Sequence, residues 1–401
     1  MTDQYVNSDI DFDDEVLISH LRQGGFLIDD DHDEHDRLRL RMLSQRFSTT
    51  SLGLTIVPTA DCNFRCPYCY EKDRIAQIYM TEEIQESIVK LLEKQVKHIS
   101  HFSVTWFGGE PLMALDIIES LSKRFIEICE DNEVAYSAGM ITNGYLLTRK
   151  TLELLKDLKV GFLQITIDGD RDTHNIMRPH VDGSGTFDKI LKNLLANSDI
   201  LPPVSLRINV DKNNIDSGRV VLNLLEEHNL LEKVMPNLGQ IIPDNGTYDK
   251  ASCLSTCDFS IETFKYYQLI SNDENFMGSY PRPVANACTA DKFNSSVIGA
   301  DGRVYRCWSD VGLDEKCVGS LLNNVKDIAI NEDIYLNYML YDPTKDRICA
   351  DCNLLPVCMG GCPYKRINDS GERCVNYKYV LENYLAIIAN KLKKQQRALR
   401  V

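Results

Sequence analysis

The chain has 401 residues, of which 43% are hydrophobic and 26% are charged, as in an ordinary globular protein. Its formal net charge of −15 disfavours a nucleic acid or an anionic membrane as the main partner. No apolar run of about 18 residues predicts a membrane span, and the first residues lack the order of a signal peptide. We therefore expect a cytoplasmic protein, in which the fourteen cysteines are metal ligands rather than disulfides.

Residues 1–50 form an N-terminal segment that is sharply acidic at 9–15 and again at 29–36. The apolar residues between these two stretches predict a short helix near Val16 and a strand over 24–28. Because runs of acidic side chains are usually solvated, we expect both stretches to be exposed.

Residues 51–243 repeat the order strand, loop and helix about six times. The predicted strands lie at 52–57, 103–107, 135–142, 162–167, 205–210 and 234–242. Amphipathic helices are predicted at 81–97, 115–130 and 148–158, and Thr81 is the expected cap of the first. Strands that alternate with helices imply a parallel sheet, either doubly wound or curled into a barrel.

Residues 244–375 do not continue the pattern of residues 51–243. A turn signal is followed by short elements and by most of the cysteines. Such a density of cysteines favours a domain held together by metal. Residues 376–401 are predicted to form a C-terminal helix.

Three cysteines follow the first predicted strand at spacings of four and three residues: Cys62, Cys66 and Cys69. A loop at the C-terminal end of a parallel strand is where barrels and open α/β sheets place their active sites. Three thiolates on so short a loop can hold three corners of a cubane iron–sulfur cluster and leave the fourth iron open. A structural zinc ion would need a fourth protein ligand nearby.

The spacing Cys-x3-Cys-x-aromatic-Cys resembles the signature of the radical S-adenosylmethionine (AdoMet) superfamily, and further motifs in its order extend over residues 52–242. The resemblance implies a partial (β/α)6 TIM-like barrel with one 4Fe–4S cluster on these three cysteines. It also implies that AdoMet contacts the chain at Tyr68, Gly108, Gly109, Glu110, Asn143, Thr166 and Arg178.

In the superfamily, residues at these positions contact different parts of AdoMet. The Gly-Gly-Glu loop would meet its amino group, Thr166 and Arg178 its sugar and carboxylate, and Tyr68 would pack on the adenine. An arginine suits a carboxylate, because the fork of its guanidinium donates two parallel hydrogen bonds.

The cysteines of the C-terminal region follow the order of a SPASM domain, which carries two auxiliary 4Fe–4S clusters in its family. Carried over by position, the ligands of the second auxiliary cluster are Cys349, Cys352, Cys358 and Cys374. Those of the first are Cys288, Cys307 and Cys362. The alternative that the spacing alone permits is a pair of zinc knuckles.

One departure from the family concerns the first auxiliary cluster. Fully liganded relatives have another cysteine six residues before Cys288, where this chain has Arg282. The cluster would therefore keep an open iron or take a fourth ligand from Cys253, Cys257 or Cys317.

A second departure concerns a general base. In anaerobic sulfatase-maturing enzymes an aspartate directly follows the position of Cys307, where this chain has Trp308. Asp310, two residues further on, is the candidate base here.

The resemblance implies a peptide maturase that abstracts a hydrogen atom from a precursor peptide and forms a thioether between a cysteine sulfur and a carbon. Alternatives are a carbon–carbon or carbon–oxygen crosslink, formylglycine formation, or, from another class, an iron–sulfur electron-transfer or scaffold protein. The expected partners are a ribosomally made precursor peptide and a reductant such as flavodoxin or ferredoxin. The acidic stretches near residues 13 and 30 are hypothesised to meet a basic leader peptide.

Overall fold

The computed structural model describes residues 15–23, 33–243, 248–270, 281–322, 330–369 and 371–398, together with positions 27, 29 and 246. The strands are β1 Ser51–Ile56, β2 His101–Trp106, β3 Ala135–Ile141, β4 Val160–Thr166, β5 Val204–Val210, β6 Val234–Gln240, β7 Ser295–Ile298, β8 Arg303–Tyr305 and β9 Gly319–Ser320. The α-helices are α2 Glu15–Gln23, α3 Glu34–Arg46, α4 Glu82–Gln95, α5 Leu115–Asp131, α6 Arg149–Asp157, α7 Arg171–Met177, α8 Phe187–Ala196, α9 Ser217–Glu227, α10 Thr256–Ile270, α11 Glu332–Met339, α12 Leu355–Cys358, α13 Pro363–Asn368 and α14 Tyr377–Ala398.

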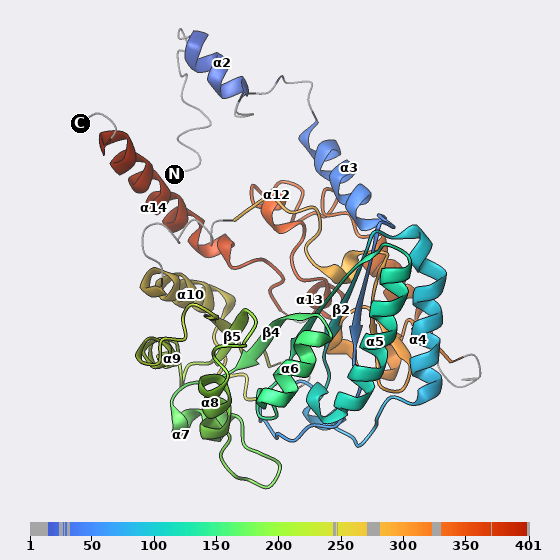
Figure 1. The fold of residues 1–401 in the computed structure, drawn as a ribbon. Coiled ribbons are helices and arrows are strands. Elements are labelled where there is room, and N and C mark those ends of the chain that lie inside the picture. The colour runs from blue at the N-terminus through green and yellow to red at the C-terminus, as the bar shows by residue number, and fades with distance from the viewer. Residues whose placement is uncertain are drawn as a thin grey trace.

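The strands form a single sheet in the order β6-β5-β4-β3-β2-β1-β7-β8-β9 (Figure 1). Strands β1 to β6 pair with their neighbours in parallel, and β7 also pairs in parallel with β1. Strands β8 and β9 complete the sheet in antiparallel order. All six predicted strands are present within two residues of their expected bounds, and the predicted partial barrel is confirmed.

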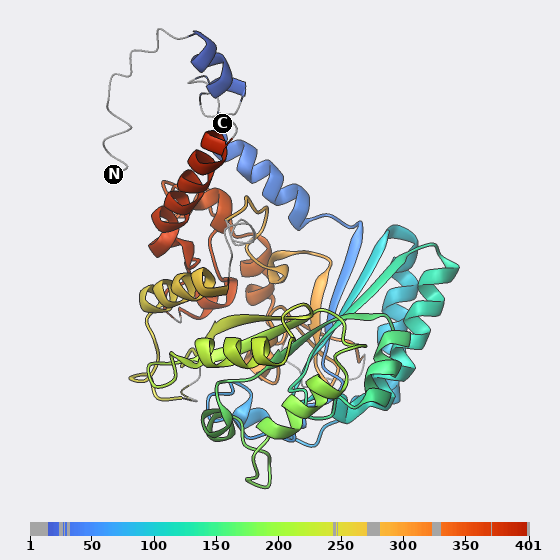
Figure 2. The ribbon, with the colours of Figure 1, turned by 60° about the vertical axis from the view of Figure 1, so that its left-hand side comes forward.

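Apolar side chains on one face of each barrel strand pack against the surrounding helices. In β2 every second residue is buried, namely Phe102, Val104 and Trp106, as expected for period-two alternation. Figure 2 shows α4 and α5 on one side of the sheet and the C-terminal region on the other. Thr81 caps α4 as predicted, because its Oγ1 accepts a hydrogen bond from the Ile84 N–H at 3.4 Å.

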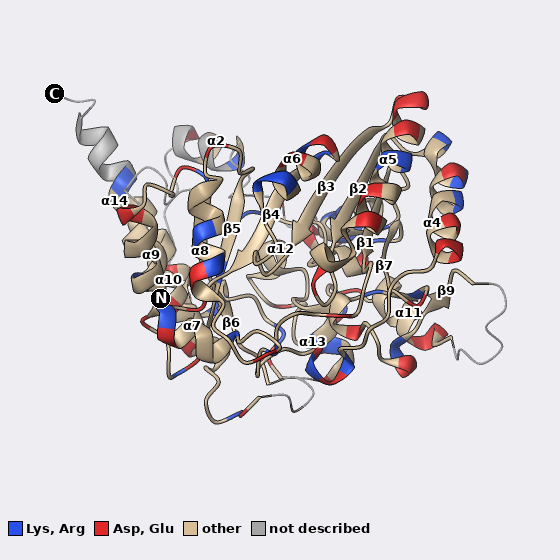
Figure 3. Cartoon of the chain, turned by 60° about the horizontal axis from the view of Figure 1, so that its bottom comes forward, with Lys and Arg blue, Asp and Glu red and all other residues tan. Residues whose placement is uncertain are grey.

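Figure 3 shows acidic and basic residues intermingled along α4 and α5. Arg124 of α5 donates to Glu86 of α4 at 3.1 Å through Nη2, and Lys123 pairs with Glu119 one turn earlier. Exposed pairs of this kind contribute only about 0–1 kcal/mol each. The apolar core beneath them therefore holds the two helices against the sheet.

The N-terminal region contains one helix, α3, that the sequence did not predict. The short helix expected near Val16 is α2, whereas the strand expected over 24–28 lies largely outside the described residues. Asp33 caps α3 by accepting from the Asp36 N–H at 3.1 Å, and the buried residue Met42 of this helix packs against Cys349, Leu355 and Met359 in the C-terminal region.

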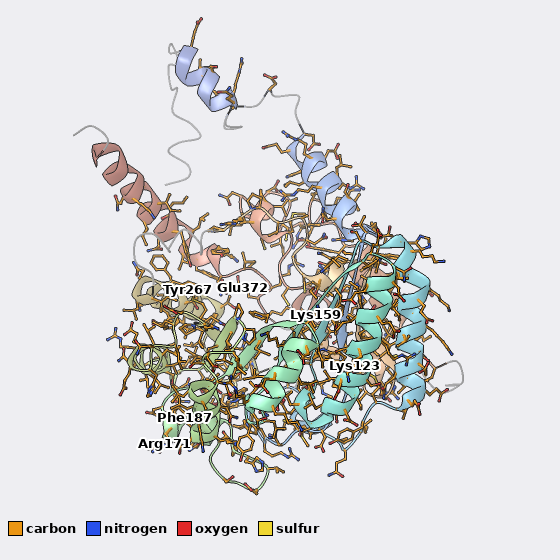
Figure 4. All side chains as sticks on the ribbon, viewed as in Figure 1. Lys123, Lys159, Arg171, Phe187, Tyr267 and Glu372 are labelled. Atoms are coloured by element: carbon orange, nitrogen blue, oxygen red, sulfur yellow. The ribbon has the colours of Figure 1, made fainter. Side chains whose placement is uncertain are left out.

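The predicted C-terminal helix is α14, and it packs against α10 through Phe264, Val380 and Tyr384. Tyr267 of α10, labelled in Figure 4, is partly buried and packs against the same cluster. The predicted division of the chain at residue 243 stays a prediction, since the sheet runs on from the barrel strands into β7, β8 and β9.

Candidate active site and cysteine clusters

The loop that carries Cys62, Cys66 and Cys69 follows β1 and lies against the loop after β2. Gly108 has φ of +129°, and a Cβ on Gly109 would lie 2.2 Å from the carbonyl oxygen of Asp61. The Glu110 N–H donates to that same carbonyl at 2.8 Å. The glycine pair is therefore required for the close approach of the two loops.

The Glu110 side chain joins the loops after β2 and β3. Its Oε1 accepts from Thr142 Oγ1 at 2.7 Å and from the Leu112 N–H at 3.0 Å, while Oε2 accepts from the Asn143 N–H at 2.8 Å. Burial raises the pKa of this carboxyl group. The sequence predicts that Glu110 binds AdoMet, which stays a prediction, and in the structure its carboxylate holds the two loops together.

Asn143 connects these two loops to the cysteine loop. Its Nδ2 donates to Asn63 Oδ1 at 2.7 Å, and its own Oδ1 accepts from the Tyr145 N–H at 2.9 Å. The amide thus links the end of β3 to the residue that follows Cys62.

The phenol of Tyr68 is the centre of a second buried network. It donates to Asp168 Oδ2 and accepts from Arg178 Nη1 at 2.7 Å and from Asn209 Nδ2 at 3.1 Å. Asp168 also accepts from the Asn209 N–H at 2.8 Å. The loop after β1, the loop after β4 and strand β5 therefore meet at one hydroxyl group. Asp168 and Asn209 were not assigned to the site, although both are polar residues at the C-terminal ends of parallel strands.

His174 fixes the backbone around this network. Its Nδ1 accepts from the Asp168 N–H at 3.2 Å, and its Nε2 lies 3.0 Å from the hydroxyl of Thr186, which donates to the Arg178 carbonyl at 2.6 Å. These partners require a neutral ring with its proton on Nε2. Burial and the nearby Arg178 charge lower the pKa of His174 to about 3.

The guanidinium of Arg178 is held beside the cysteine loop. It lies 5.6 Å from the centroid of the Phe64 ring, and its charge lowers the pKa of Cys66 against the larger raising effect of burial. Within the described residues its buried Nε has no hydrogen-bond partner. A fixed cation with a spare donor next to three thiols suits the carboxylate of a bound ligand. Thr166 is buried at the end of β4, in register with Arg207 of β5.

The three thiols of the cysteine loop are protonated as long as no metal is bound. Burial raises the pKa of Cys62 and Cys66, and it raises that of Cys69 to about 12. Thiol ligands lose their protons when a metal binds. Among the described residues, no three acidic, histidine or cysteine side chains converge on one metal ion. A cubane cluster does not need such a point, because each thiolate binds a different iron.

The predicted ligands of the first auxiliary cluster gather around the buried phenol of Tyr338. Burial raises the pKa of Tyr338, and so do the thiols of Cys307, Cys362 and Cys288, together with Asp310. The Tyr338 hydroxyl donates to Asp310 Oδ2 at 3.4 Å. The structure therefore brings these three cysteines together, with a carboxylate beside them.

Three of the four predicted ligands of the second auxiliary cluster also face one another. Burial, followed by the thiols of Cys374 and Cys349, raises the pKa of Cys358. Cys349 Sγ accepts from Arg373 Nη2 at 3.5 Å and from the Tyr341 hydroxyl at 3.6 Å. Cys352 follows on the same turn, since its N–H donates to the Cys349 carbonyl at 3.1 Å.

The three cysteines considered as a fourth ligand of the first auxiliary cluster lie in different surroundings. The Cys317 thiol donates to the Gly319 carbonyl at 3.0 Å inside a separate apolar cluster with Tyr305 and Val297. Cys253 packs with Met177 and Ile241 beside Tyr68. Cys257 belongs to α10.

A cavity of about 950 Å³ separates the barrel from the C-terminal region. Tyr70 of the cysteine loop and Cys253 line it on the barrel side, while Asp310 and Tyr364 line it on the other. Asp310 is 1% exposed, and among the described residues its Oδ1 has no hydrogen-bond partner. Trp308 lies at the boundary, with its ring centroid 5.8 Å from that of Phe107 after β2.

A partial barrel with three cysteines on the loop after its first strand defines a class of iron–sulfur enzymes that bind their cofactor at the strand ends. Residues 56–222 match the family described as the Radical SAM superfamily. These residues therefore form a radical SAM domain, which implies a 4Fe–4S cluster and AdoMet. No helix in the described ranges is long and apolar enough to cross a membrane.

The likeness to two curated relatives extends beyond this domain. The chain is 23% identical over 339 residues to a cysteine-type anaerobic sulfatase-maturating enzyme of Clostridium novyi, covering 78% of this chain and 88% of the relative. It is 24% identical over 366 residues to the enzyme of the same description from Clostridium perfringens, covering 83% and 94%.

Two solved structures share the fold. Native anSMEcpe with bound AdoMet and Cp18Cys peptide matches with a TM-score of 0.64 at 20% identity, over 85% of this chain and 99% of the other. SuiB of Streptococcus suis bound to precursor peptide SuiA matches with a TM-score of 0.56 at 15% identity, over 90% and 87%. Both likenesses span the barrel and the cysteine-rich region.

Proposed function

We propose that this chain is a peptide maturase that removes a hydrogen atom from a precursor peptide and joins a cysteine sulfur to the resulting carbon in a thioether. The observation that carries the proposal is the cavity of about 950 Å³, whose walls include both Tyr70 of the cysteine loop and Asp310 beside Cys307. A space of this size accommodates a short peptide segment. The related structures of anSMEcpe and SuiB, both solved with a bound peptide, support a peptide substrate.

In this proposal Cys62, Cys66 and Cys69 hold the catalytic cluster and the remaining predicted cysteines hold two auxiliary 4Fe–4S clusters. When bound, the catalytic cluster and AdoMet supply a radical that abstracts hydrogen atoms, and the auxiliary clusters supply an acceptor for the remaining electron. Flavodoxin or ferredoxin is the proposed reductant.

The chain itself positions the reactants. Arg178, fixed by Tyr68 and Asp168, would bind the AdoMet carboxylate, and Thr166 its sugar. Glu110 and Asn143 would hold the loops around the AdoMet amino group. Positioning of this kind lowers the barrier because the reacting groups lose their freedom of motion before the chemical step.

Asp310 is the proposed base for the thiol of the substrate cysteine. It lines the cavity, and its Oδ1 has no hydrogen-bond partner within the described chain. Thioether formation breaks one C–H and one S–H bond, so a group must accept the proton that leaves sulfur.

Formylglycine formation is the second candidate, favoured by the two clostridial relatives that cover 78% and 83% of this chain. The presence of Trp308 at the position of their base argues against it. Carbon–carbon and carbon–oxygen crosslinks are further alternatives that the same cavity accommodates.

The test is an anaerobic assay of the reconstituted full chain with reductant, AdoMet and one of two peptides. The first peptide is a cysteine-rich product of a neighbouring gene, and the second is the Cp18Cys peptide named for anSMEcpe. We expect 5′-deoxyadenosine and, for the first peptide, a product two hydrogens lighter with one thiol fewer. Conversion of the cysteine of the second peptide to formylglycine, in which oxygen replaces sulfur and two hydrogens are lost, would instead identify a sulfatase-type maturase.

Two variants with the same chemical change separate the role of Asp310 from general damage. Asp310→Asn should retain iron and 5′-deoxyadenosine formation but lose peptide modification. Asp314→Asn changes a carboxylate that is 78% exposed and should behave as the unmodified enzyme. Full peptide modification by Asp310→Asn would reject the assignment of the base.

A further inference from the structure

Four charged side chains meet beneath the surface between the two sets of auxiliary cysteines. They are Asp291 and three arginines from distant parts of the chain: Arg46 at the end of α3, Arg306 before Cys307, and Arg366 on α13. Asp291 is 0% exposed, Arg46 is 2% exposed and Arg306 is 4% exposed. The side chain of Arg366 is 8% exposed. Burial raises the pKa of the Asp291 carboxyl group, and each of the three arginines acts electrostatically to lower it.

The hydrogen bonds of two of these arginines go to neutral carbonyl groups. Arg46 Nη1 donates to the carbonyls of Met339 at 3.1 Å and Tyr341 at 2.5 Å. Arg306 donates to the Ala290 carbonyl through Nη2 at 2.8 Å and Nε at 3.1 Å. Carbonyl groups satisfy the donors but leave the positive charges uncompensated.

Asp291 compensates only part of this charge. Arg366 Nη2 lies 3.7 Å from Asp291 Oδ1, and neither carboxylate oxygen has a hydrogen-bond partner in the part of the chain that the structure describes. The neighbouring carboxylates form their ion pairs with other arginines, Asp342 with Arg39 at 2.9 Å and Asp346 with Arg373 at 2.8 Å, although Asp342 also acts electrostatically on Arg46. Three buried cations thus face one buried anion. Such an excess is costly unless a further anion lies nearby.

Both sets of auxiliary cysteines lie against this group. On one side Asp291 ends a short 3₁₀ helix that begins after Cys288, and its charge acts on the Cys288 thiol. On the other side Arg366 lies 3.6 Å above the ring of Tyr341, whose hydroxyl donates to Cys349 Sγ at 3.6 Å. Arg366 is therefore the member that reaches toward both sets.

We propose that Arg46, Arg306 and Arg366 form around Asp291 a cationic centre that both auxiliary clusters share, and that this centre raises the reduction potential of each cluster. A cluster held by thiolates gains one negative charge on reduction, and fixed positive charges nearby favour that state. The inference rests on the proposed function, since it requires that both sets of cysteines hold clusters.

The test is a reductive titration of the anaerobically reconstituted full chain, followed by electron paramagnetic resonance. A variant with Cys62, Cys66 and Cys69 replaced by alanine identifies the signals of the auxiliary clusters. We expect Arg366→Met to shift the midpoint potentials of both auxiliary clusters to more negative values and to leave that of the catalytic cluster in place. Arg366→Lys, which retains the charge, should keep both potentials close to those of the unmodified chain.

The controls distinguish charge from folding and from the cluster assignment itself. Arg149→Met removes a surface arginine that pairs with Asp199 on the barrel, and it should change neither auxiliary potential. Unshifted potentials in Arg366→Met at full iron content would overturn the cationic centre, as would an equal shift in Arg366→Lys. An unmodified chain with only about four irons would instead refute the two auxiliary clusters.

Discussion

Arg178 donates a hydrogen bond to the phenol oxygen of Tyr68 at 2.7 Å, although 110 residues separate the two in the chain. The contact joins the segment after β4 to the cysteine loop after β1. It also occupies one donor of the arginine while its Nε stays available within the described structure. The orientation of Arg178, which we propose binds AdoMet, therefore depends on Tyr68, which lies between Cys66 and Cys69 in the sequence.

Tyr68→Phe should destabilise the protein and weaken AdoMet binding together. Removing the hydroxyl leaves buried groups of Asp168, Arg178 and Asn209 without a partner, which costs about 1–3 kcal/mol of unfolding free energy. Chemical unfolding of the apo-protein and calorimetric titration of the reconstituted protein with AdoMet measure the two effects. Tyr145→Phe is the control, because the Tyr145 ring stacks on His180 at 5.2 Å outside this network. Equal stability of both variants would contradict the expectation.

Glu110→Gln should lower stability although it preserves shape. The amide nitrogen of glutamine would replace an oxygen that accepts from Asn143 or from Leu112 and Thr142, so two donors would face each other. We expect a loss of about 1–3 kcal/mol in urea unfolding. Glu119→Gln makes the same change in an exposed pair with Lys123 and should cost less than about 1 kcal/mol.

His174 should make the protein acid-sensitive. Its pKa is about 3 in the folded chain and about 6.5 when unfolded, so below pH 6.5 the unfolded state binds a proton that the folded state excludes. The contribution is complete above pH 6.5 and is lost as the pH falls, by about 2 kcal/mol at pH 5. Unfolding free energies of the apo-protein at pH 7 and pH 5 measure it, and His174→Gln should remove this part of the pH dependence. An unchanged dependence in that variant would assign the acid sensitivity to other groups.

Replacing Cys62, Cys66 and Cys69 by alanine should remove about four of the twelve irons expected for three 4Fe–4S clusters. Formation of 5′-deoxyadenosine should cease, while the auxiliary irons remain. Cys129→Ala tests the effect of losing a thiol elsewhere, because Cys129 is a buried residue of α5. This variant should retain all its iron and lose only stability. Iron analysis and chromatography of the reaction mixture distinguish the two cases.

The barrel could be predicted from the sequence because the residue pattern of each strand is contained in one short segment. Alternation such as that of Phe102, Val104 and Trp106 shows a strand within six residues. Helix α3 was missed for the opposite reason, because its buried residues include Met42 and the charged Arg46 in an otherwise polar segment. Its partners lie near residues 340 and 350, so no local pattern reveals them.

The sequence predicts several candidate site residues, but it does not predict the hydrogen bonds that connect them. The resemblance to a SPASM domain implies which cysteines belong together, and the structure brings Cys288, Cys307 and Cys362 around Tyr338. The roles of the predicted AdoMet contacts stay predictions. That the Tyr68 hydroxyl meets Asp168 could not be inferred, because one hundred residues separate them and the contact exists only once the strands are aligned.

The pairing of β7 with β1 has a consequence for how the two halves of the chain can be separated. Strand β1 is hydrogen-bonded on one side to β2 and on the other to β7, which starts at Ser295. A protein cut before that residue would expose the backbone of β1 directly below the cysteine loop, and an unpaired edge of this kind invites aggregation. The halves are therefore not interchangeable modules, and a deletion that abolishes activity would remove a neighbour of the catalytic strand along with the auxiliary cysteines. Point substitutions of single cysteines separate these two effects, whereas truncation combines them.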